Sequence, residues 1–184
     1  MKNSLTYKIC ICALLTAFAL IAFILESLLP PLLIPGARLG LSNAFILLTF
    51  ILLGAPYGFS ALIVKCTLGS VFSGNISAII YSLPSGVFAL GVQALLMYFC
   101  KRVSVVCVST VGGVINLVCQ NLTFCLVTGT IEFIVYLPYL ALIGVLSGLV
   151  VGFAVFLTVK FLPRSIYDKL LSFSGGKTLE NQKG

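Results

Sequence analysis

The chain of 184 residues contains no histidine and no tryptophan, and only 8% of its residues are charged. Its acidic residues number four, and Asp168 is the only aspartate. Histidine is the commonest metal ligand and the usual proton shuttle at neutral pH, so its absence argues against hydrolytic and zinc chemistry. The shortage of carboxylates leaves no aspartate-rich pair to hold magnesium and a diphosphate. We therefore expect no metal site, no cofactor and no catalytic residues.

Long apolar runs dominate the chain, which is 60% hydrophobic with a mean hydropathy of +1.22. A soluble domain is typically about 45–50% apolar and about 25% charged. A membrane-spanning helix needs about 20 mostly apolar residues. We therefore expect an all-α, multi-pass membrane protein, with a six-transmembrane-helix domain over residues 1–163 and a polar cytoplasmic tail over 164–184. The expected spans are 9–29, 38–53, 57–74, 77–99, 103–128 and 134–162, of which the second is short.

The net charge of +7 comes from basic residues that flank the apolar runs. Such flanking Lys and Arg set the orientation of membrane helices, because they remain on the cytoplasmic side. With six spans, only Arg38 lies on the opposite side, so both termini are predicted to be cytoplasmic in a bacterial plasma membrane. The basic residues on the cytoplasmic side are Lys2, Lys8, Lys101, Arg102, Lys160, Arg164, Lys169, Lys177 and Lys183.

Polar side chains inside the expected spans are the candidates for function, because each is costly in a bilayer. Asn116, Gln120 and Thr123 are spaced four and three apart, so they share one helix face. Together with residues of other spans they predict a cavity in the outer half of the bundle, in which Arg38 and Lys65 supply positive charge. The predicted substrate-binding residues are Arg38, Asn43, Lys65, Ser70, Asn75, Tyr81, Asn116 and Gln120.

The same polar groups allow a purely structural interpretation. Glu26 could pair with Arg38, and Lys65 with Glu132, so that the charges hold helices together. Asn121 lies off the shared face and is interpreted as structural. Glu132 is close enough to the membrane surface to be solvated.

Small residues at helical spacing give a second signal. Gly144, Gly148 and Gly152 recur every four residues, a pattern that allows the backbone of a neighbouring helix to approach closely. We interpret this stripe as packing within the chain. Ala13 and Ala17 form a similar AxxxA pair on the first expected helix.

Four segments together resemble a known family. Residues 35–43 read PGARLGLSN, residues 65–74 read KCTLGSVFSG, residues 116–120 read NLVCQ and residues 136–138 read YLP. They are similar to the signature segments of the Gx transporter family, which is often labelled heptaprenyl diphosphate synthase component I. Lys65 stands where that family usually has Arg, which keeps the charge but loses the bidentate fork. Ile115 precedes Asn116 where the family often has His.

The resemblance implies the fold of a substrate-binding S component of an energy-coupling factor (ECF) importer. It implies an outward-facing pocket for a vitamin-like or precursor molecule, with anionic, flavin-related and isoprenoid- or quinone-related compounds all compatible. Ala13 and Ala17 would then dock on a membrane coupling (T) subunit, and two cytoplasmic ATPase subunits would power transport. This chain has no complete P-loop, since the first glycine of the motif would fall on Leu171.

Two alternatives remain open at this level. A membrane accessory subunit of a prenyl diphosphate synthase would also need no catalytic residues of its own. A structural subunit of a larger membrane complex would need no cavity beside its buried charges.

Overall fold

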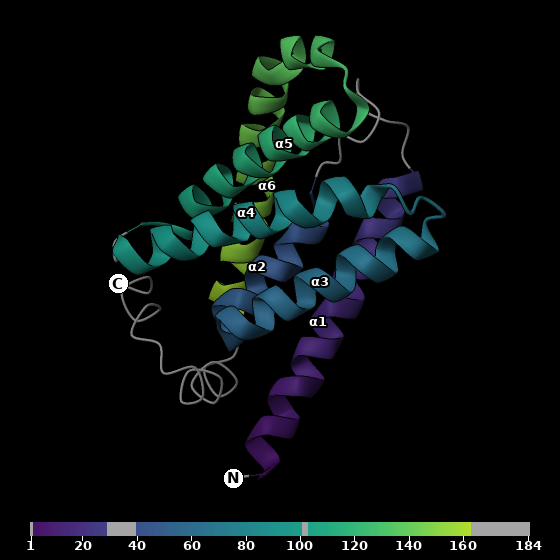
Figure 1. Cartoon of the computed structure of the whole chain (residues 1–184). Coiled ribbons are helices and arrows are strands. Elements are labelled where there is room, and N and C mark those ends of the chain that lie inside the picture. The colour runs from purple at the N-terminus through teal and green to yellow at the C-terminus, as the bar shows by residue number, and fades with distance from the viewer. Residues whose placement is uncertain (1, 29–39, 101–102, 163–184) are drawn as a thin grey trace.

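The computed structural model describes residues 2–28, 40–100 and 103–162, and it is built of helices throughout (Figure 1). This confirms the all-α prediction for the part of the chain that is described. Arg38 and the expected tail over 164–184 lie outside it. The elements are α1 (Lys2–Leu28), α2 (Ser42–Leu53), α3 (Ala55–Phe72), α4 (Ala78–Phe99), α5 (Val105–Thr128), the 3-10 helix η1 (Ile131–Tyr136) and α6 (Leu137–Phe161).

Five of the six α-helices in the described ranges are long and apolar enough to cross a membrane. The exception is α2, which has 12 residues. At 1.5 Å per residue it is about 18 Å long, whereas the hydrocarbon core is about 30 Å thick. The expected span over 38–53 is therefore only partly confirmed, because the helix described there begins at Ser42.

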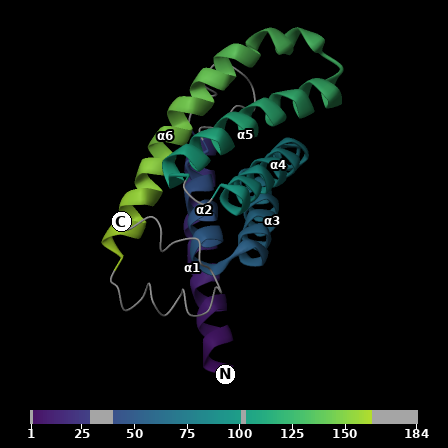
Figure 2. The same ribbon diagram turned by 90° about the vertical axis from the view of Figure 1, so that its left-hand side faces the viewer.

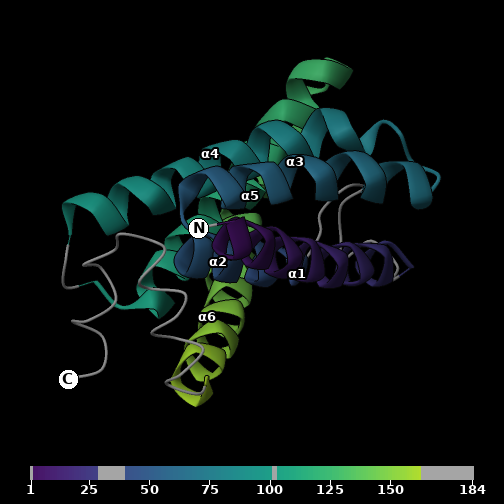
Figure 3. The ribbon, with the colours of Figure 1, turned by 90° about the horizontal axis from the view of Figure 1, so that it is seen from below.

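Despite its length, α2 lies at the centre of the bundle, packed against α1, α3 and α6. Leu47, Ile51 and Leu52 are buried in a cluster with Leu15 of α1 and Val155 of α6. A hairpin of α3 and α4 covers one side, and the longer hairpin of α5 and α6 covers the other (Figures 2 and 3). A helix surrounded in this way needs apolar residues on almost every face, which matches its sequence.

The glycine stripe of α6 packs within the chain, as predicted, and its partner is α5. A Cβ atom on Gly148 would lie 2.6 Å from Thr110 Cα, and one on Gly144 would lie 2.7 Å from Val114 Cα. Because these neighbours are backbone atoms, no side chain could move aside to make room. The two helices are in backbone contact along this stripe.

The outward faces of the helices are apolar. On α6, the exposed side chains include Leu142, Leu146, Val150 and Phe153. The buried polar residues of the described part instead lie between helices. This apolar-outside, polar-inside arrangement is what a lipid solvent favours.

Candidate binding site

Polar groups gather in one half of the bundle, near the end of α1 and the beginning of α2. The backbone N–H of Ser42, at the first turn of α2, donates to Glu26 Oε1 of α1 at 3.1 Å. Leu41, which precedes the helix, provides no side-chain cap. The first N–H groups of a helix have no partner within it and carry partial positive charge. Glu26 therefore supplies from another helix the acceptor that α2 lacks.

Lys65 reaches the same turn from the middle of α3. Its Nζ donates to Asn43 Oδ1 at 2.7 Å and to Ser42 Oγ at 3.3 Å. It also lies 5.6 Å from the centroid of the Phe23 ring, within range of a cation–π interaction. The Lys65 side chain is only 4% exposed. The buried ammonium group is thus held by α2 and faces α1.

Two cavities meet at this cluster, and both are lined by Gly40, Asn43 and Asn116. Gly40 has a φ of 78°, which few residues other than glycine adopt, and it forms the turn that precedes α2. One of the two contains Glu26 and Lys65 in its lining, and we call it the charged cavity. It has a volume of about 20 Å³ and is lined by Phe23, Glu26, Gly40, Ser42, Asn43, Lys65, Ser82, Ser85, Asn116 and Gln120.

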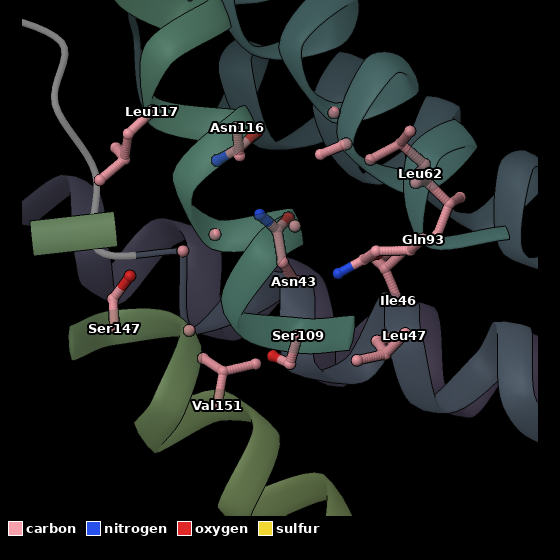
Figure 4. A pocket seen from close by; sticks show the side chains of 17 residues that line it. Asn43, Ile46, Leu47, Leu62, Gln93, Ser109, Asn116, Leu117, Ser147 and Val151 are labelled. Atoms are coloured by element: carbon pink, nitrogen blue, oxygen red, sulfur yellow. The ribbon is translucent and has the colours of Figure 1, made fainter. Parts of the chain in front are cut away.

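The second cavity lies deeper, between α2, α4, α5 and α6, and has a volume of about 30 Å³ (Figure 4). Its polar lining is uncharged and includes Gln93, Ser109, Asn116 and Ser147, set among apolar side chains such as Leu62. We call it the neutral cavity. In Figure 4 the amide groups of Asn43, Gln93 and Asn116 converge on the same space.

Gln93 shapes this neutral cavity. Its Nε2 donates to the carbonyl of Val108 at 3.4 Å, a long bond from a side chain only 9% exposed. The side chain fills the space that a Cβ atom on Gly112 would occupy, so any other residue at position 112 would require Gln93 to move. An amide buried with one long bond keeps hydrogen-bonding capacity for something else in the cavity.

Both cavities are small. Each has room for about one water molecule, whereas pockets for small molecules usually measure about 300–1,000 Å³. The structure therefore describes a closed interior. A larger ligand could enter only if the helices around the cavities moved apart.

Four of the predicted binding residues come together as expected. Asn43, Lys65, Asn116 and Gln120 line the charged cavity, although they come from three helices. Within the described residues, no hydrogen bond is made by the Asn116 side chain. This group was predicted from the cost of placing amides and cations in a membrane helix.

Three other predicted binding residues lie elsewhere, and Arg38 is outside the described residues. Ser70 is fully buried on α3 and its hydroxyl has no hydrogen-bond partner among the described residues, but it lines neither cavity. Asn75 is exposed in the turn between α3 and α4. The ring of Tyr81 packs against Phe124, with centroids 5.4 Å apart.

Several lining residues were not among the predicted binding residues. Glu26 and Gln93 carried a visible signal, because each is a costly polar group within an apolar run. The serines of the cavities carried little signal, since a serine in a helix can bond to its own backbone. Ser82 does so, with its hydroxyl donating to the carbonyl of Ala78 at 2.8 Å.

The structural interpretation holds for Asn121, whose Nδ2 donates to the carbonyl of Phe133 at 3.0 Å and ties η1 to α5. The proposed pair of Lys65 with Glu132 does not form, because Glu132 is exposed on η1 while Lys65 is bonded to α2. The predicted pair of Glu26 with Arg38 lies partly outside the described residues.

An apolar groove runs along the surface between α1 and α3. It has a volume of about 620 Å³, and its lining includes Ala13, Ala17, Ser60, Val64 and Leu68. Both alanines are exposed. The AxxxA pair therefore faces outward and leaves its small side chains at the bottom of an open surface depression.

Five long apolar helices around a small polar interior define a multi-pass membrane protein. Among the described residues, no group of three His, Cys, Asp or Glu side chains could hold a metal ion. The sequence profile of the family described as "Heptaprenyl diphosphate synthase component I" matches residues 15–158. The chain belongs to this family. No curated protein and no solved structure matches it.

Proposed function

We propose that this protein is the substrate-binding S component of an ECF-type importer in a bacterial plasma membrane. The observation that carries the proposal is the convergence of Asn43, Lys65, Asn116 and Gln120 on one interior cavity. Buried polar groups in a membrane bundle commonly mark the path or site of a polar substrate. With both termini in the cytoplasm, this half of the bundle faces outward, toward incoming substrate.

The groove between α1 and α3 supports a role for a coupling subunit. Ala13 and Ala17 are exposed within it, and small residues allow a second helix to approach closely. A helix of the membrane coupling subunit would occupy this groove, and two cytoplasmic ATPase subunits would supply energy. In this proposal the chain binds and carries its substrate and catalyses no reaction.

Native mass spectrometry of the detergent-purified protein, without added ligand, tests the proposal directly. We expect a small molecule bound one-to-one, and we expect Lys65→Gln to lose it. The matched control is Tyr98→Ala, because Tyr98 is 78% exposed and lies near the far end of α4. A protein that carries no small molecule when purified from membranes would contradict the proposal.

A second candidate function follows from the family's description. The chain would then be the membrane accessory subunit of a prenyl diphosphate synthase and would assist a soluble catalytic partner. A soluble synthase that copurifies with the chain at a fixed ratio, with no bound small molecule, would favour this candidate.

A further inference from the structure

We infer that the neutral cavity is a binding site for one ordered water molecule, held between the hydroxyl of Ser109 and the amide of Gln93. Ser109 lies on α5 and Gln93 on α4, so the water joins two helices of the bundle. The site is independent of the proposed function, because it belongs to the interior of the protein before any substrate enters.

Ser109 is a buried serine whose hydroxyl has no protein partner. Its side chain is only 2% exposed, and it makes no hydrogen bond to a described residue. A serine or threonine in a helix can bond to a backbone carbonyl three or four residues earlier. Thr110 does so with Val106 at 2.8 Å, and Ser85 does so with Ser82 at 3.1 Å. A buried hydroxyl without any partner is costly, so Ser109 requires one from the cavity that it lines.

The amide of Gln93 reaches the same part of α5. Its Nε2 donates to the carbonyl of Val108 at 3.4 Å and lies beside Gly112, three residues after Ser109. The amide has a second N–H and a carbonyl oxygen, and neither bonds to a described residue. In Figure 4 the side chains of Gln93 and Ser109 both border the neutral cavity. The two incompletely bonded groups therefore adjoin the same space.

The size and polarity of the space suit water. The neutral cavity measures about 30 Å³. A cavity needs about 10–15 Å³ to hold one water molecule, and the water needs about two to four polar partners. A wholly apolar cavity would stay dry, but here Asn116 adds a third polar group that has no described hydrogen bond. Water both donates and accepts, so one molecule can satisfy the hydroxyl and the amide together.

Ser70 on α3 provides a matched contrast. It is also a fully buried serine in an apolar helix, and its hydroxyl has no partner among the described residues. Unlike Ser109, it lines neither cavity. Removing the Ser70 hydroxyl therefore removes no bond to a water in either cavity.

Replacing each serine with alanine separates the two cases. Ser109→Ala removes a partner of the water and should lower the midpoint of thermal unfolding in detergent by about 2–4 °C. Ser70→Ala removes an unbonded hydroxyl and should leave the midpoint unchanged or raise it. Equal shifts for the two variants, or a higher midpoint for Ser109→Ala, would overturn the inference.

NMR can detect the water directly, in purified protein labelled with ¹⁵N-glycine and dialysed free of any copurified small molecule. Gly112 and Gly113 line the cavity from within α5. We expect their amide protons to show cross peaks with water, with opposite signs in laboratory-frame and rotating-frame spectra. That sign pattern indicates a long-lived bound water and excludes proton exchange. The cross peaks should disappear in Ser109→Ala and remain in Ser70→Ala.

The variant Gln93→Leu completes the test, because it keeps the Ser109 hydroxyl and removes the second partner. We expect it to lose the cross peaks as well. Cross peaks that persist in Gln93→Leu would come from the serine hydroxyl and would contradict a water held by both groups. Folded wild-type protein without these cross peaks would have a dry cavity, which would also overturn the inference. Neither result bears on transport, which native mass spectrometry tests separately.

Discussion

Asn116 and Asn121 lie five residues apart on α5, and their amides have different surroundings. The Asn121 amide donates to the carbonyl of Phe133, while Asn116 faces both cavities. The sequence had placed them on different faces of the helix, because only Asn116 shares a face with Gln120. Their similar chemistry and position make them a matched pair for experiment.

Asn121→Ala should lower the free energy of unfolding by about 1 kcal/mol, since hydrogen bonds between membrane helices contribute about 0.6–2 kcal/mol. Asn116→Ala should change stability less, because no described hydrogen bond is lost, and should weaken substrate binding instead. Thermal unfolding in detergent and retention of the bound small molecule measure the two effects. Equal effects of the two substitutions on binding would contradict this assignment.

At this scale the sequence predicted about half of the site. An amide or a cation within an apolar run is costly in a membrane, so it indicates a partner or a function. This criterion identified Lys65, Asn43, Asn116 and Gln120. The sequence could not show how deep in the bundle a side chain lies or which way it points. Tyr81 and Asn75 fall at suitable positions along their segments, but the rotation of α4 turns one toward Phe124, and the turn exposes the other.

Among the elements, α5 and α6 form the tightest contact, and its glycines were recognised from spacing alone. Gly148→Ala should destabilise the protein by about 1–3 kcal/mol, because the new Cβ would lie 2.6 Å from Thr110 Cα and the backbone must shift. Gly91→Ala on α4 is the control. Nothing lies within 4 Å of a Cβ atom there, so the substitution should be stabilising by about 0.5–1 kcal/mol. Unfolding of both variants in detergent would separate the two effects, and equal stabilities would refute the packing account.

The second helix shows where reasoning from sequence stops. The apolar run was recognised and its shortness was expected, but its central position was not. A run without polar residues fits a helix facing lipid and a helix enclosed by others equally well. The N-terminal acceptor also comes from Glu26 on another helix, 16 residues away along the chain, which no local capping rule would identify.

For the whole molecule, the proposed docking groove gives the sharpest prediction. Ala13→Trp should abolish uptake while leaving the bound small molecule in place, because the indole would fill the groove between α1 and α3. Leu14→Trp is the matched control, since Leu14 is 57% exposed and does not line that groove. Uptake by transformed cells and native mass spectrometry measure the two properties. Normal uptake by the Ala13→Trp variant would exclude docking at this face.

The predicted orientation can be tested with exposed positions at opposite ends of α4. Cys100 follows the end of α4, and Asn75 precedes its beginning. In a background without the other cysteines, a membrane-impermeant maleimide should label Cys100 only in inverted vesicles. With Cys100 also replaced, Asn75→Cys should be labelled in intact cells. The reverse pattern would place the termini outside.

The backbone contact between α5 and α6 also limits how the closed interior can open. The backbones meet directly at Gly144 and Gly148, so the two helices cannot slide or separate without losing these close contacts. The two helices would therefore move together as one rigid unit. Space for a ligand would come from tilting α5 and α6 together away from α2 and α4, which form the opposite wall of the neutral cavity. Glycines that never touch the substrate would then determine how stiffly the molecule resists its entry.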